Sequence, residues 1–170
     1  MSDKFDENGK IVMDHTSKVM FFYAVMRDDF DIVRFRLEQN DDNINLVTDD
    51  GRTPLMCAKS TQMVELLCEY GAEVNQRDEN GMTALMHAAE RVMELDDRDE
   101  IYNEVMYMNA LIDLGADVYA VDNNGYSTLD RVDDELKEFI LEEVEFIKAK
   151  KEQEDKTEFF IKYVLQEKNR

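Results

Sequence analysis

The residue types that most often perform chemistry are few in this chain, and their spacing matches no common catalytic pattern. The candidates for nucleophilic catalysis are Ser2, Ser17, Ser60, Ser127, His15 and His87. None of the serines lies in a Gly-x-Ser-x-Gly elbow, and the chain has no glycine-rich phosphate loop. The spacing places no carboxylate beside His87, so we expect its side chain to pack rather than to catalyse, and we expect His15 at the surface. The sequence therefore predicts a protein that is not an enzyme.

Carboxylates are abundant, but their spacing does not suit a metal ion. Neighbouring aspartates recur at residues 28–29, 41–42, 49–50, 96–97 and 133–134. None of these pairs matches the calcium-loop pattern Asp-x-Asp-x-Asp-Gly with its terminal glutamate. The two cysteines, Cys57 and Cys68, lack the Cys-x-x-Cys or Cys/His spacing of a zinc site. We therefore expect no metal and no cofactor, and we expect buried, reduced thiols rather than an inter-helix disulfide.

The charge of the chain favours some partners and disfavours others. Acidic residues outnumber basic ones by 40 to 20, which gives a net charge of −20. Such a charge repels nucleic-acid phosphates and attracts basic proteins. Residues 1–16 have no apolar signal-peptide core, and no apolar run reaches the ~20 residues needed to span a bilayer. We expect a cytoplasmic monomer that binds a protein rather than nucleic acid or membrane; secretion without a cleaved signal stays open.

The elements that would position any site come from a repeated unit. The stretch Asp78-Glu-Asn-Gly-Met-Thr-Ala-Leu-Met-His-Ala-Ala89 is echoed by residues 48–58 before it and residues 122–129 after it. A second matching piece precedes two of the copies, at residues 66–75 and 111–119. Five of the six glycines fall on repeat positions, where tight turns and helix ends favour φ > 0: Gly51, Gly71, Gly81, Gly115 and Gly125. The only proline, Pro54, follows Thr53 where a helix would begin.

Together these motifs resemble the ankyrin repeat, with its turn, two helices and Thr-Pro-Leu-His-x-Ala signature. The resemblance implies an all-α solenoid of stacked helix-turn-helix units with short β-turn tips and a C-terminal capping helix or helices. We assign residues 1–16 to a disordered or loosely docked segment and residues 17–132 to repeats, divided as 17–47, 48–77, 78–121 and a partial 122–132. Residues 133–170 form the predicted helical cap.

Helical spacing of apolar residues gives the expected helices of each repeat. In the first repeat a turn at residues 27–29 divides two helices within residues 17–39. The second repeat should hold helices at residues 53–59 and 62–70. The third should begin at residues 83–89 and resume near Val105, after an insertion at residues 90–104. This insertion is a loop flanked by extended helices or a lengthened hairpin that protrudes from the stack. It either contributes to the binding face or is a solvated extension without a partner.

The last part of the chain allows two interpretations. Apolar stripes mark residues 133–150 and 157–166, and the charged residues 150–156 between them are a connecting turn or part of one long helix. The stripes either cover the last repeat as a cap or form an amphipathic helix that pairs with another protein or another copy of this one.

The resemblance also implies a binding surface, because ankyrin proteins generally bind other proteins with the turn tips and the inner face of the first helices. The predicted partner-binding residues are Asp49, Asp50, Arg52, Arg77, Glu79, Asn80, Met82, Asn123, Asn124 and Tyr126 at the tips, with Lys59 and Arg91 at the first-helix ends. We expect Met82 and Tyr126 to be exposed anchors, unless one or both pack on a neighbouring turn.

These features predict a non-enzymatic protein-interaction module, acting as an adaptor or a stoichiometric inhibitor. A basic partner such as a nuclease toxin is one candidate, since carboxylates could occupy a site meant for phosphates. The alternative is a structural or assembly protein that pairs through its C-terminal amphipathic helices.

Overall fold

The computed structural model describes residues 4–5, 11–12, 15–39 and 44–168. It divides into two compact units, residues 1–132 and residues 133–170, and each is treated by itself. The described residues are mostly helical, with one short antiparallel ladder between β1 (Lys4–Phe5) and β2 (Ile11–Val12). The predicted all-α ankyrin-type fold is confirmed. Most of the segment predicted to be disordered or loosely docked, residues 1–16, lies outside the described residues, although α1 already begins at His15.

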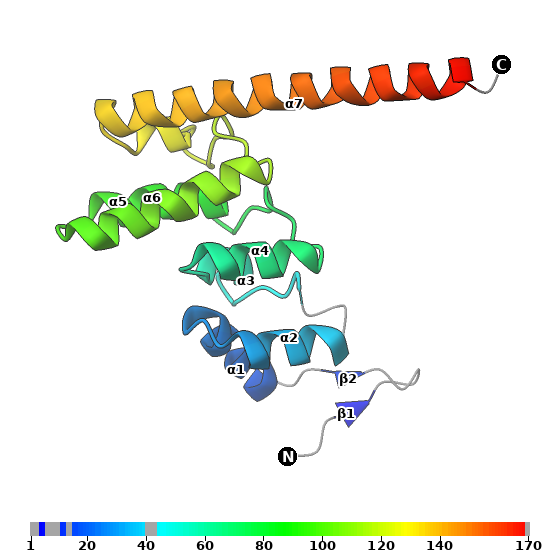
Figure 1. The fold of residues 1–170 in the computed structure, drawn as a ribbon. Coiled ribbons are helices and arrows are strands. Elements are labelled where there is room, and N and C mark those ends of the chain that lie inside the picture. Colours follow the sequence, from blue (N-terminus) through cyan, green and yellow to red (C-terminus); the bar gives the residue numbers. More distant parts are fainter. Residues whose placement is uncertain (1–3, 6–10, 13–14, 40–43, 169–170) are drawn as a thin grey trace. The chain divides into compact units, whose positions relative to one another are not determined.

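Successive helix pairs are layered in chain order along the first unit (Figure 1). The first pair is α1 (His15–Met26) and α2 (Phe30–Gln39), and the second is α3 (Pro54–Cys57) and α4 (Thr61–Glu69). The third pair is α5 (Ala84–Met93) and α6 (Arg98–Asp113), followed by a single 3-10 turn, η2 (Thr128–Asp130). The predicted division at residues 27–29 is confirmed, and Asp28 adopts a positive φ of 54° there.

Side-chain caps explain where the short helices begin. The hydroxyls of Thr53, Ser60 and Thr83 accept the backbone N–H of the residue three positions on, at 3.2 to 3.4 Å. At the other end, Gly71 and Gly115 take φ of 89° and 96°, and the next amide reaches back to the helix at 2.9 to 3.0 Å. The helix predicted at residues 53–59 is shorter than expected, because Ala58 is already extended at ψ 152°.

The core runs through all the helix pairs and uses methionine as freely as leucine. Leu55, Leu67, Leu85 and Leu111 are 0–1% exposed, and Met63, Met86 and Met108 are 0% exposed. Methionine is unbranched and fills irregular gaps between layers, which accounts for part of the methionine content of this chain.

The insertion in the third repeat is a lengthened helix hairpin. Helix α5 continues to Met93 and α6 begins at Arg98, so only residues 94–97 connect them. The predicted restart near Val105 is therefore wrong: Asp97 caps α6 earlier by accepting the amides of Asp99 and Glu100 at 2.9 and 3.1 Å. In Figure 1 this hairpin reaches farther at its connecting end than α3 and α4 do.

The second unit is one helix, α7 (Asp134–Lys168). It runs unbroken through residues 150–156, where both a turn and a continuous helix were open. Ion pairs at helical spacing support it, with Lys148 Nζ 2.8 Å from Glu145 Oε1 and Lys156 Nζ 3.9 Å from Glu152 Oε2. Its role as a cap stays a prediction.

Candidate functional site

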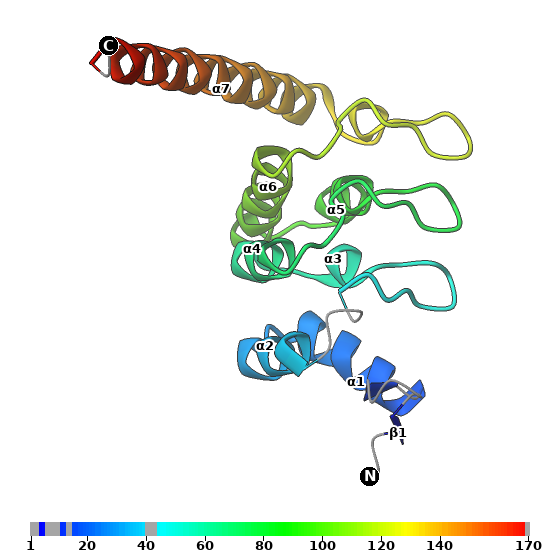
Figure 2. The same ribbon diagram turned by 90° about the vertical axis from the view of Figure 1, so that its right-hand side faces the viewer.

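Three turns of the same construction line one edge of the first unit (Figure 2). They are residues 48–52, 78–82 and 122–126, and the first N–H of each donates to the carbonyl of the fifth residue at 2.9 to 3.0 Å. Asp78 and Asp122 open two of the turns, and each accepts two backbone N–H groups on Oδ1 at 2.8 to 3.0 Å. Backbone and side chain together thus hold each turn in one shape.

Hydrogen bonds also join each turn to the next. The Glu79 amide donates to the Asp50 carbonyl at 3.4 Å, and the Asn123 amide donates to the Asn80 carbonyl at 3.0 Å. The Asn123 side chain donates to the Glu79 carbonyl at 2.9 Å, and the Arg77 guanidinium donates to the carbonyl of Val121. Arg77 and Asn123, both predicted to bind a partner, therefore already bridge two turns.

The close approach of the turns explains the glycine at position 81. Gly81 has φ of 78°, and a Cβ built on it would lie 2.9 Å from the backbone nitrogen of Asn123. Any other residue would be strained at this φ and would also push the last turn away.

Most side chains predicted to bind a partner are exposed, and the turns present them in a row. The exposed ones are Asp49, Asp50, Arg52, Lys59, Arg77, Glu79, Asn80, Asn123, Asn124 and Tyr126. Asp50 and Arg52 form an exposed ion pair at 3.0 Å, and a hydrogen bond from the Thr48 hydroxyl, more than the ion pair, lowers the pKa of Asp50. The structure thus brings the residues of the turns together on one edge, whereas Lys59 lies away from it, in a groove with Arg91 and Glu94.

Met82 does not belong to this surface. Its side chain is 7% exposed, so the prediction of an exposed anchor is wrong for this residue. The reason is that Met82 lies in the middle turn, which is hydrogen-bonded to another turn on either side. Tyr126, at the matching position of the last turn, is 58% exposed.

The segment that leads into the last turn also exposes apolar side chains. Tyr119 is 56% exposed and Val121 is 43% exposed. Sequence reasoning missed Tyr119, although a signal existed: the matching residue of the preceding repeat is Asn75, whose amide bonds to Gly115 and Asp117 at 2.9 and 2.8 Å. A tyrosine at this position cannot form the two hydrogen bonds that Asn75 makes, which indicates that its side chain is not needed to join neighbouring repeats.

Arg91, predicted to bind a partner, is half-buried in a network behind the turns. Its Nη2 lies 2.7 Å from Oε1 of Glu104, and its Cζ lies 5.1 Å from the ring centre of Tyr107. The Tyr107 hydroxyl donates to the carbonyl of Leu55 at 2.7 Å, and full burial raises the pKa of Tyr107. This arrangement ties the second repeat to the third, so the guanidinium of Arg91 is engaged in structure.

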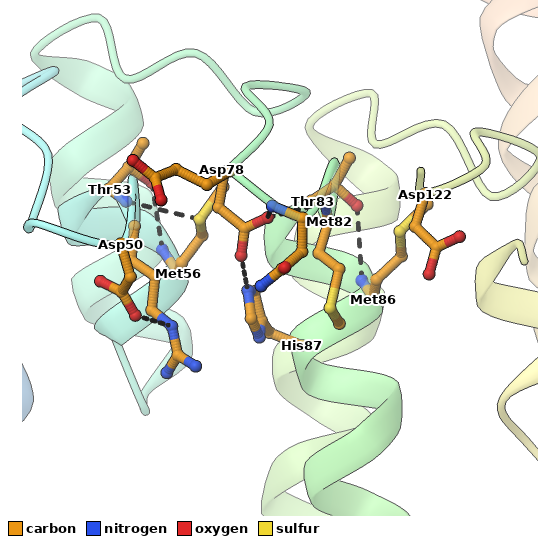
Figure 3. A network of polar contacts seen from close by, with 12 residues as sticks. Asp50, Thr53, Met56, Asp78, Met82, Thr83, Met86, His87 and Asp122 are labelled. Atoms are coloured by element: carbon orange, nitrogen blue, oxygen red, sulfur yellow. Dashed lines mark hydrogen bonds and ion pairs between the residues drawn. The ribbon is translucent and has the colours of Figure 1, made fainter. Parts of the chain in front are cut away.

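A carboxylate does lie beside His87, contrary to the reading of the sequence. His87 Nε2 is 2.8 Å from Oδ2 of Asp78, and both residues are 7% exposed (Figure 3). Burial lowers the pKa of His87 in spite of the opposing effect of Asp78. The neutral imidazole therefore donates to the carboxylate that shapes the turn, which agrees with the expected packing role.

The lengthened hairpin adds a polar groove at the other end of the first helices. Lys59, Glu94, Glu100 and Asn103 line it, together with the Arg91–Glu104 pair. Residues 94–100 hold five carboxylates and one arginine. The strongest local concentration of negative charge in the third repeat thus lies next to the predicted first-helix positions.

The described part of the chain holds no group of three His, Cys, Asp or Glu side chains that could bind a metal ion. Cys57 and Cys68 are both unpaired, and burial raises their pKa, to about 11 for Cys68. Such thiols are poor nucleophiles at neutral pH. Among the described helices, none combines the length and apolar character needed to cross a membrane.

Comparison with known proteins places this geometry in context. Residues 21–122 match the family model described as "Ankyrin repeats (3 copies)". The chain is 33% identical over 115 residues to "Ankyrin repeat and SAM domain-containing protein 6" of Mus musculus, covering 65% of this chain and 12% of that protein. It is 40% identical over 79 residues to "Ankyrin repeat domain-containing protein 63" of Homo sapiens, covering 42% of this chain and 21% of that protein. The match thus spans only a small part of these relatives.

Proposed function

Because the chain belongs to the ankyrin-repeat family, whose repeats are generally protein–protein interaction modules, we propose that it is a non-enzymatic adaptor or stoichiometric inhibitor. It docks one partner on the edge formed by the three turns. The observation that carries this proposal is the row of exposed side chains on turns that are hydrogen-bonded to one another. A surface held in one shape loses little conformational entropy on binding.

The centre of the proposed interface is the last turn. Tyr126 and Tyr119 are more than half exposed, and Val121 lies between them in the chain. Tyrosine is enriched among the residues that dominate interface energies, because its ring offers a large contact area and its hydroxyl a hydrogen bond. The neighbouring amides of Asn80 and Asn124 add polar contacts at the rim.

The proposed partner is a basic protein, and a nuclease toxin is one example. The net charge of −20 and the carboxylates of residues 94–100, next to Lys59, support this choice. Long-range attraction between opposite charges speeds association and weakens with salt. The same proposal includes a cytoplasmic location, in keeping with two unpaired thiols. Subcellular fractionation checks this location.

A second candidate function is assembly through α7, since this helix is continuous over 35 residues and exposes Phe146 at 65%. It predicts a complex that forms without the turns. Removal of residues 151–170 should then abolish binding, whereas the proposed turn surface should be unaffected by this truncation.

Affinity capture from a native lysate at physiological salt tests the first proposal. The bait is the tagged full chain, compared with Tyr126→Ala on the turn surface and with Tyr102→Ala as the matched control. Tyr102 is 65% exposed on α6, the second helix of its repeat. The control substitution therefore removes the same type of exposed side chain from a different surface. Loss of one partner in Tyr126→Ala alone supports the turn surface. Equal capture by both variants contradicts it.

The purified partner then allows the charge argument to be tested. The association rate constant should fall steeply between about 0.01 M and 0.15 M salt, where the screening length shrinks from about 30 Å to about 8 Å. A rate constant that does not change with salt would show that the acidic surface plays no part in recognition.

A further inference from the structure

The first helix pair carries a second exposed apolar surface, far along the stack from the last turn. Helices α1 and α2 form a groove whose apolar lining includes Met20, Tyr23, Ile32 and Phe35. These side chains are 55%, 59%, 45% and 61% exposed, respectively. Exposed apolar clusters of this kind mark interaction sites more often than isolated apolar side chains do.

The same helix pair is electrically neutral in a strongly acidic protein. Residues 15–39 hold four basic residues and four acidic ones, whereas the whole chain has a net charge of −20. Two copies of the chain that met through any strongly acidic surface would repel each other. The first helix pair is therefore a surface on which a second copy meets little local electrostatic opposition.

The order of residues on α2 is self-complementary. Asp31, Ile32, Phe35 and Arg36 all line the groove, and their positions along the helix confine them to one side of it. When two copies of a helix pack antiparallel about a two-fold axis, each residue faces one residue of the other copy. The numbers of the two facing residues add up to the same sum for every such pair. An axis midway between residues 33 and 34 sets Asp31 opposite Arg36 of the second copy and Ile32 opposite its Phe35.

Both charged residues are available for this arrangement. Among the side chains that the structure describes, at residues 18–39 and 44–156, those of Asp31 and Arg36 form no hydrogen bond or ion pair. An isologous contact uses each pair twice, so two ion pairs would flank a centre of two isoleucines and two phenylalanines. Two helices packed antiparallel at a modest crossing angle of about 20° keep these four residues of each helix in contact.

We propose that this groove is the contact surface of a reversible homodimer, in which α2 of one copy packs antiparallel on α2 of another. It departs from the monomer expected from the sequence, and it leaves the turn surface of both copies free. Because one helix pair offers a small contact area, we expect weak, reversible association, with a dissociation constant on the order of 10–100 µM. The two surfaces fail or succeed independently, since the dimer needs no partner and the partner needs no α2.

Analytical ultracentrifugation of the full chain from about 5 to 200 µM in 0.15 M salt tests the proposal. The wild type should shift from monomer toward dimer over this range. Phe35→Ser should remain monomeric, because it removes half of the apolar centre. Tyr102→Ser, which changes an exposed side chain of α6 instead, should dimerise as the wild type does.

A charge swap distinguishes this contact from any other. Asp31→Arg sets two arginines against each other, and Arg36→Asp sets two aspartates against each other; each should weaken dimerisation about tenfold or more, because the change acts twice. The double variant D31R/R36D restores both opposite-charge pairs and should recover dimerisation. Melting temperatures within a few degrees of the wild type show that all variants fold.

Three results would overturn the proposal. One is a wild type that stays monomeric at 200 µM. If Phe35→Ser then also lowers the melting temperature, another part of the same chain, and not a second copy, covers the groove. Another is a dimer that persists in Phe35→Ser and disappears when residues 151–170 are removed, since α7 would then be the contact. The third is a double variant D31R/R36D that stays as weak as the single variants.

Discussion

Replacing Asp78 with alanine tests whether one carboxylate holds the middle turn to the helix behind it. The side chain is 1% exposed and accepts three hydrogen bonds, from the amides of Asn80 and Met82 at 2.9 Å and from His87 Nε2 at 2.8 Å. Alanine leaves the buried Met82 amide and the buried imidazole without a partner. Each buried donor that loses its acceptor costs about 1–3 kcal/mol.

The expected loss in the free energy of unfolding is therefore about 3–4 kcal/mol for Asp78→Ala. Asp78→Asn should cost only about 1 kcal/mol, because its oxygen still accepts both amides and His87 can accept from the new amide as the other tautomer. Urea unfolding at pH 7.5, followed by circular dichroism, measures both. The exposed neighbour Glu79→Ala is the control and should stay within about 0.5 kcal/mol of the wild type.

A loss below about 1 kcal/mol for Asp78→Ala would refute this reasoning, since it would mean that water or a shifted side chain satisfies both donors. Equal losses for Asp78→Ala and Asp78→Asn would refute it in another way. In that case the negative charge, and not the hydrogen bonds, would be what the turn requires.

Three further predictions concern His87, Tyr107 and Gly81. Because burial lowers the pKa of His87 below its ordinary value of about 6.5, the unfolded state takes up a proton first as pH falls from about 7 to 5; stability should therefore decrease over this range, and urea midpoints for His87→Gln should decrease less. Tyr107→Phe leaves the Leu55 carbonyl unpaired and should lower the free energy of unfolding by about 1 kcal/mol, whereas an unchanged urea midpoint would show that this hydrogen bond adds nothing. Gly81→Ala should lower the melting temperature more than Gly115→Ala, because both glycines have positive φ but only Gly81 faces another turn; equal losses would show that backbone strain alone matters.

The sequence predicted the repeats and their order well, because the residues that end or begin each helix are local signals. Gly71 and Gly115 follow the apolar runs that they terminate, and Thr53 and Thr83 precede the helices that they cap. The end of α5 was harder to predict, because residues 90–104 have no such signal at the expected place. The cap that matters is Asp97, one of many aspartates in a charged stretch.

The candidate site was predicted as a set of positions, but not residue by residue. Burial of Met82 depends on having a turn on both sides, and the pairing of Arg91 with Glu104 depends on how α5 packs on α6. His87 and Asp78 are nine residues apart and meet only because the turn folds back over the start of α5. Contacts of this kind arise from packing between elements, and local spacing does not encode them.

The junctions between turns are unequal, and this sets an order in which the edge opens. One backbone hydrogen bond of 3.4 Å joins residues 48–52 to residues 78–82. Residues 78–82 and 122–126 are joined by the backbone and side-chain hydrogen bonds of Asn123, at 3.0 and 2.9 Å, and Arg77 and Val121, which precede these two turns, add a further one. Thermal opening should begin at the first junction, so deuterium should replace the Glu79 amide hydrogen sooner than that of Asn123. The hydrogen bonds between the turns would then break in sequence, beginning at residues 48–52 and reaching the last turn, residues 122–126, at the end.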